Sequence, residues 1–237
     1  METPVNASFS EKLRIERIKL KEMSFKEKVE YIWEYYKFHI IIFAVILIIT
    51  GTIIYSQVLN PAPETILFIS FNGGVATEEQ ISDLTSYLEN RLINEGENEE
   101  VVILQMLLID EGTSINVMNN TRTAAWITVG QLDVFINDYD MLELNSSNWF
   151  IEPMDEQKLA FLNMTNPEAY KLIEENFVYM THKFEDGSVS EYLAGVNIGK
   201  SPLLTKLGFI EQDLVYSIAI NTHNIGNGLD GLIAFFE

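Results

Sequence analysis

Polar and flexible residues follow three apolar segments of the chain, and together they form the best candidate for a ligand site. Amide, carboxylate, hydroxyl and backbone groups of this kind bind polar solutes through hydrogen bonds. Glycine also lets the backbone approach a ligand closely. The same residue types are ordinary in turns, so one such group alone would mean little. The three groups are Asn72, Gly73 and Gly74; Glu111, Gly112 and Thr113; and Asn137, Asp138 and Tyr139.

The segments before these groups have the pattern of buried parallel strands. They are 65–71 (TILFISF), 101–109 (VVILQMLLI) and 132–136 (LDVFI), continuous apolar runs of the type that is covered on both faces. Helical patterns at about 78–92 and 114–129 separate them, which predicts a doubly wound, mostly parallel α/β sheet. The carboxyl ends of parallel strands lie along one edge, where ligands bind. We therefore expect the nine residues to line a site for a small solute or peptide.

The sequence contains no catalytic or metal-binding motif that we recognise. A Walker loop, a nucleophile elbow, an HExxH motif and a dinucleotide fingerprint are all missing. The chain has no cysteine and only three scattered histidines, which argues against thiolate chemistry, disulfides and a zinc site. Asn137, Asp138 and Asp140 supply too few ligands for calcium. We expect neither enzymatic activity nor a metal or cofactor.

An uncharged run from 38 to 63 is the strongest single signal in the chain. Its core, residues 40–59 (IIIFAVILIITGTIIYSQVL), would span about 30 Å as a helix, the thickness of a bilayer core. A buried core helix is usually shorter, and a cleaved signal peptide would lie nearer the start and carry a small-residue cleavage pattern. We therefore predict a retained transmembrane helix.

Charge is divided unevenly between the two sides of this run. Residues 1–39 contain eight Lys/Arg and seven Glu, whereas residues 60–237 contain seven Lys/Arg and 28 acidic residues, a net charge of −21. By the positive-inside rule the N-terminus is predicted to be cytoplasmic and the C-terminal domain extracellular. The acidic domain argues against nucleic-acid binding. An exported domain without disulfides points to a bacterial protein.

These signals predict four parts of the chain. Residues 141–200, with short helices and a hairpin of 177–184 and 189–198 around an Asp-Gly pair, could form a small second lobe. A strand at 214–220 and an apolar helix close the pattern. The four parts are a cytoplasmic helical tail at 1–37, with capping boxes beginning at Ser8 and Ser24; a transmembrane helix at 38–59; a proline-stiffened linker at 60–64; and an extracytoplasmic α/β domain at 65–237.

Short stretches of the chain resemble known families. Residues 130–138 (GQLDVFIND) and 216–222 (YSIAINT) resemble extracellular solute-binding proteins, and residues 24–43 resemble the juxtamembrane stretch of single-pass membrane proteins of Firmicutes. The first resemblance implies a periplasmic-binding-protein-like fold. Members of that family are usually longer, two-lobed and tethered through a lipidated cysteine, so the second lobe here would be reduced.

The residues and the resemblance together lead to one expected function and one alternative. We expect a noncatalytic, membrane-anchored binding module of a Gram-positive bacterium that serves as a sensor or as an accessory subunit of a transporter such as an ABC transporter. The alternative is a structural subunit of a membrane complex that binds proteins and no small molecule. Both include the lipid bilayer and a membrane protein as partners.

Overall fold

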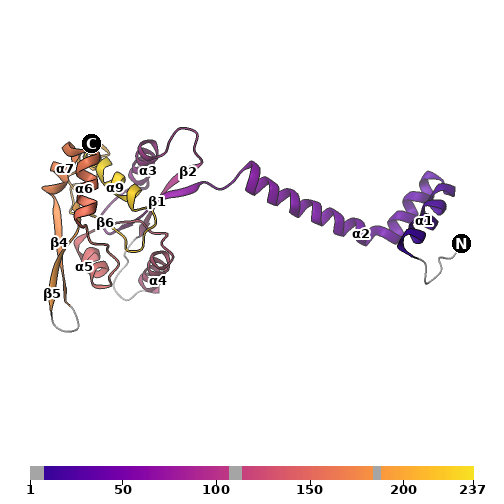
Figure 1. Cartoon of the computed structure of the whole chain (residues 1–237), viewed down its shortest axis with the longest axis horizontal. Helices are drawn as coiled ribbons and strands as arrows, with labels where there is room; N and C mark the ends of the chain where they lie inside the picture. The colour runs from indigo at the N-terminus through magenta and orange to yellow at the C-terminus, as the bar shows by residue number, and fades with distance from the viewer. Residues whose placement is uncertain (1–7, 107–113, 184–187) are drawn as a thin grey trace. The chain divides into compact units, whose positions relative to one another are not determined.

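The chain divides into two compact units, Met1–Ala62 and Pro63–Glu237. The computed structural model describes residues 8–106, 114–183 and 188–237, and Figure 1 labels the helices and strands in chain order.

The first unit is helical, and its helices begin where the sequence predicts. Helix α1 (Phe9–Glu22) starts after Ser8, whose hydroxyl accepts a hydrogen bond from the Glu11 amide. Helix α2 (Phe25–Ile54) starts with a complete capping box, because Ser24 and Glu27 each accept a hydrogen bond from the other's backbone N–H. A π-helical turn, η1 (Tyr55–Leu59), continues it. The end of the predicted tail and the predicted transmembrane run thus lie in one continuous helix.

The helix Phe25–Leu59 is the one helix among the described residues that is long and apolar enough to cross a membrane. None of the residues in its most apolar window is buried by other parts of the protein. Length and composition of this kind fit a membrane anchor and also fit a signal sequence near the N-terminus.

The second unit is built on a six-stranded mixed sheet with the strand order β2-β1-β3-β6-β5-β4. The first three strands of that order are parallel, as the sequence predicts. The other three join with antiparallel pairings, because β4 and β5 form the expected hairpin and β6 pairs antiparallel to both β3 and β5. The parallel arrangement therefore holds for one half of the sheet. The strands are β1 (Glu64–Asn72), β2 (Glu99–Met106), β3 (Val134–Asn137), β4 (Phe177–Lys183), β5 (Val189–Asn197) and β6 (Val215–Ile218).

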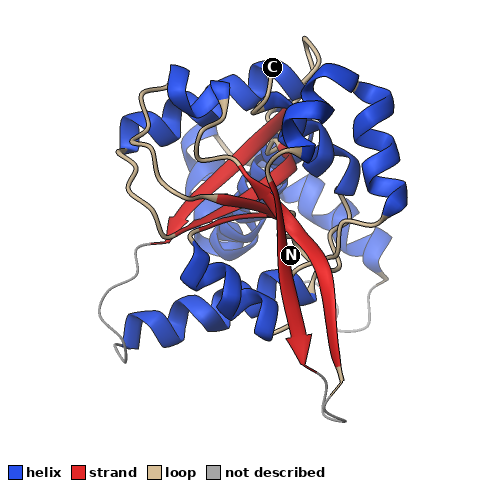
Figure 2. Cartoon of the chain, turned by 90° about the vertical axis from the view of Figure 1, so that its left-hand side faces the viewer, coloured by secondary structure: helices blue, strands red, loops and turns tan. Residues whose placement is uncertain are grey.

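Helices cover both faces of this sheet (Figure 2). The larger apolar core packs one face against α3, α6, α7, α8 and α9, while α4 and α5 cover the other face through two smaller clusters. Of these helices, α8 was not predicted. Their bounds are α3 (Glu78–Leu92), α4 (Ser114–Thr128), α5 (Tyr139–Ser147), α6 (Glu156–Thr165), α7 (Pro167–Glu174), α8 (Pro202–Lys206) and α9 (Ile225–Ala234).

Strand β1 shows how one apolar run serves both faces. Leu67, Ile69 and Phe71 belong to the larger core, and Phe68 belongs to the cluster beneath α4. Side chains alternate between the two faces of a strand. A strand covered on both sides therefore reads as a continuous apolar run.

Residues 141–200, considered above as a second lobe, lie in the same compact unit as the rest of the domain. They supply α5, α6, α7 and two strands of the common sheet.

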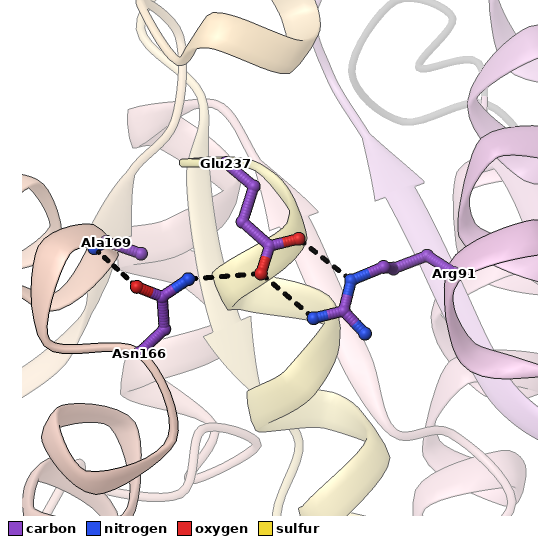
Figure 3. Close-up of polar contacts among 4 residues, drawn as sticks. All are labelled: Arg91, Asn166, Ala169 and Glu237. Carbon is purple, nitrogen blue, oxygen red and sulfur yellow. Dashed lines mark hydrogen bonds and ion pairs between the residues drawn. The ribbon is translucent and has the colours of Figure 1, made fainter.

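A polar cluster fastens several helices at one end of the larger core (Figure 3). Arg91 at the end of α3 donates two hydrogen bonds to the Glu237 carboxylate, 2.8 and 2.9 Å long. The Asn166 amide donates to the same carboxylate at 3.1 Å. The Asn166 side-chain oxygen also caps α7 by accepting from the Ala169 amide. Glu237 thus links α3 to the junction of α6 and α7.

Candidate functional site

Two of the three predicted ligand groups meet at the carboxyl edge of the parallel strands. Asn72 and Asn137 are paired in register at the ends of β1 and β3, and the Asn72 side-chain amide donates to the Asn137 side-chain oxygen at 3.0 Å. Val215 is the next residue in this row and Asn197 follows it. The expected convergence is present for these two groups. Glu111, Gly112 and Thr113, the third group, lie outside the described residues.

The two asparagines lie inside the protein, with exposed fractions of 2% for Asn72 and 0% for Asn137. Asn72 accepts a hydrogen bond from the Ser70 hydroxyl at 2.8 Å, and Asn137 accepts a second one from the Asn145 amide of α5 at 3.2 Å. The Asn137 side-chain nitrogen is buried and has no hydrogen-bond partner among the described residues. This network therefore holds α5 against the sheet and leaves one donor group unsatisfied, which is uncommon in a protein interior.

The neighbouring residues of the same edge shape the turns. Asp138 caps α5 by accepting from the Met141 amide at 2.9 Å. Gly73 has φ +77°, and a Cβ placed there would lie 2.0 Å from an Asp138 carboxylate oxygen, so a side chain does not fit. Gly74, with φ +75°, packs beside Leu214. Tyr139 is 45% exposed. Of the four other described residues of these two groups, Tyr139 is the one that presents a large side chain to solvent.

A pocket that the sequence analysis did not predict opens at the opposite edge of the sheet. Its volume is about 530 Å³, within the usual range of small-molecule sites. It lies beside the first residues of β1 and between the loops that precede β3 and follow β6. Its lining residues are Glu64, Thr65, Phe68, Val102, Gly130, Gln131, His223 and Asn224.

Two loops meet tightly to form one wall of this pocket. Gly130 has φ +68°, and a Cβ there would lie 2.5 Å from the His223 ring and 2.8 Å from the Asn221 carbonyl oxygen. Asn221 itself adopts φ +64°, a conformation that asparagine tolerates better than most residues. In the sequence, Gly130 follows the helical pattern at 114–129 and begins the stretch 130–138 that resembles solute-binding proteins. Neither signal indicated its contact with His223.

A buried carboxylate lies behind the pocket. Asp133 is 1% exposed and accepts hydrogen bonds from the Phe68 amide at 2.8 Å, from the Thr222 hydroxyl and from the Asn224 amide at 3.4 Å. Burial raises the pKa of Asp133, and these hydrogen bonds oppose that rise. Phe68 and Asn224 also line the pocket. The Asp133 carboxylate is therefore hydrogen-bonded to two residues that line the cavity.

The described part of the chain contains no cluster of side chains that could bind a metal ion. Within residues 8–106, 114–183 and 188–237, no group of three His, Asp or Glu side chains is placed to hold an ion.

Comparison with known proteins gives no further guide: neither the protein-family models nor the curated protein sequences contain a match to this chain. Both edges of the sheet must therefore be judged on geometry and chemistry alone.

Proposed function

We propose that this protein is a noncatalytic, membrane-anchored binding module, acting as a sensor or as an accessory subunit of a transporter. In this proposal the α2–η1 helix crosses the cell membrane, the N-terminal helix lies in the cytoplasm, and the α/β domain faces outward. The ligand, a small solute or peptide, would bind at the carboxyl edge beside the exposed Tyr139, next to the turns that cover the buried pair Asn72 and Asn137. The periplasmic-binding-protein-like resemblance belongs to the same proposal.

The observation that carries the membrane anchor is the contrast between the two units. The second unit packs most of its apolar side chains into buried clusters, whereas those along Phe25–Leu59 are mostly exposed, Ile48 by 69% and Phe43 by 62%. An apolar surface of this extent needs a nonpolar environment from outside the chain. A bilayer supplies one of the right thickness for a helix of this length.

Cysteine labelling tests the anchor and its orientation. The chain has no cysteine, so a single introduced thiol gives a signal without background. We expect Glu97→Cys, on an exposed turn of the domain, to react with a membrane-impermeant maleimide in intact cells. Glu22→Cys, exposed at the end of α1, should react only after the cells are permeabilised. The reverse pattern would refute the orientation, and a mature N-terminus beyond residue 54 would identify a cleaved signal sequence.

Ligand binding can be tested on the full chain in detergent. A panel of amino acids, short peptides and sugars is screened for compounds that raise the melting temperature, as expected for ligands of the folded state. Tyr139→Ala should weaken such a ligand by severalfold. Tyr179→Ala, which removes a comparably exposed tyrosine from β4 (55%), should not. Equal effects of the two variants would move the ligand away from the carboxyl edge.

The alternative, a structural subunit of a membrane complex, is favoured by apolar side chains in the first unit ahead of the most apolar part of α2. Phe25 is 84% and Trp33 is 63% exposed, and such residues can contact a partner protein as well as lipid. This alternative expects a membrane protein to copurify with the full chain and to be lost when residues 1–59 are deleted. A partner retained by residues 60–237 would place the contact on the α/β domain.

A further inference from the structure

The pocket beside the first residues of β1, the amino-edge pocket, is lined by both apolar and polar residues. Phe68 and Val102 supply the apolar part, and Glu64 places a carboxylate at the beginning of β1. Thr65, Gln131 and Asn224 add hydroxyl and amide groups. Apolar walls with a few placed polar groups are typical of small-molecule sites.

The pocket is lined by one carboxylate, that of Glu64, and one imidazole, that of His223. Its lining includes Glu64 but no lysine or arginine, and the carboxylate of Asp133 lies behind Phe68 and Asn224. Among the described residues no cation forms an ion pair with Glu64 or Asp133. The surrounding domain, with its net charge of −21 over residues 60–237, adds to the negative potential. The pocket is therefore complementary to a positive charge.

Asp133 makes this preference stronger than an exposed carboxylate alone would. Its hydrogen-bond partners among the described residues, the Phe68 amide, Thr222 and Asn224, are all neutral. A buried carboxylate without a cation pays a desolvation cost that a nearby positive charge offsets.

We propose that this pocket binds a small organic cation, with its ammonium group beside Glu64 and its apolar part on Phe68 and Val102. The site is separate from the carboxyl edge discussed above and does not depend on it. The tight contact between Gly130 and His223 fixes the wall against which such a ligand would lie.

Three probes of similar shape and different charge test the proposal on the full chain in a nonionic detergent. They are phenethylammonium, 2-phenylethanol and phenylacetate, titrated calorimetrically with detergent-only titrations as the baseline. Phenethylammonium should bind, the neutral alcohol should bind at least about fivefold more weakly, and the anion should not bind. Equal affinity for all three probes, or no binding of the cation at millimolar concentration, would overturn the proposal.

Variants then locate the bound cation. Glu64→Gln should weaken phenethylammonium about fivefold, whereas Glu143→Gln, which removes the same charge from an exposed position on α5, should change the affinity less than twofold. Val102→Trp should abolish binding by filling the cavity, and its melting curve shows whether the fold is retained. If Glu143→Gln weakens the cation as much as Glu64→Gln does, the pocket is refuted as the site. Tyr139→Ala should leave the affinity for phenethylammonium unchanged, because Tyr139 lies at the carboxyl edge. This result would distinguish binding in the pocket from binding at the carboxyl edge.

Discussion

Several polar residues in this domain link one helix to another, and the Arg91–Glu237 ion pair is the clearest example (Figure 3). The pair is bidentate, and its side chains are 41% and 26% exposed. Partly exposed ion pairs contribute little because water and salt screen them. The shared hydrogen bond from Asn166 gives this one a defined geometry.

Glu237→Gln should lower the free energy of unfolding by roughly 0.5–1 kcal/mol at pH 7. Hydrogen bonding to Arg91 lowers the pKa of Glu237 below its ordinary value of 4.5. A carboxylate with a lowered folded pKa stabilises the fold above its unfolded pKa, and that contribution is lost as the pH falls through the folded pKa. The difference between wild type and variant in urea melts should therefore be full above about pH 5 and shrink towards pH 3.

The matched control is Glu211→Gln, which breaks the Lys200–Glu211 pair. Its side chains are 75% and 69% exposed, so this variant should change stability less than Glu237→Gln. A pH-independent effect of Glu237→Gln would show that the carboxylate acts through packing and not through its charge.

The residue scale also shows what the sequence could and could not predict about the site. Convergence of Asn72 and Asn137 was predictable, because both end parallel strands. Their burial was not, since an asparagine that ends a strand can turn towards solvent or towards a helix. The amino-edge pocket depends on Gly130 touching His223, a contact between loops far apart in the chain that leaves no local pattern.

At the scale of elements, capping groups and apolar periodicity in the sequence predicted most of the helices and most of their boundaries. Thr77 and Gln80 form a capping box at the start of α3. The direction of β6 was not predictable, because an apolar strand such as Leu214–Ile220 can pair either way. Helix α8 is five residues long, too short for a periodic signal.

Thr77→Ala should reduce the free energy of unfolding by about 1 kcal/mol, because the Gln80 amide loses its capping oxygen. Thr85→Ala in the same helix is the control: Thr85 donates only to the Ile81 carbonyl within the helix, so its removal should be nearly neutral. Chemical denaturation of both variants measures the difference. Equal losses would show that α3 is held by packing alone and that its N-cap is dispensable.

At the scale of the whole molecule, the division into two units predicts independent folding. The unit Pro63–Glu237 contains the whole sheet and all three buried clusters. A protein of residues 63–237 should therefore be soluble without detergent and unfold cooperatively within a few degrees of the domain transition in the full chain. Circular dichroism and calorimetry test this. A broad, noncooperative transition would mean that residues 1–62 are needed to complete the fold.

The row of asparagines across the sheet has a consequence for how the chain finds this fold. Asn72 and Asn137 stand at matching positions, and Asn197 stands at the matching position two strands beyond β3, with Val215 of β6 between them. If β3 slipped by one residue along β1, its side chains would exchange faces, and the Asn137 amide would enter the apolar core that Ile136 now occupies. Each amide buried without a partner costs about 1–3 kcal/mol. The asparagines thus make the native register of β1 and β3 more stable than a register shifted by one residue. Strand ends with only apolar side chains would not distinguish the two registers.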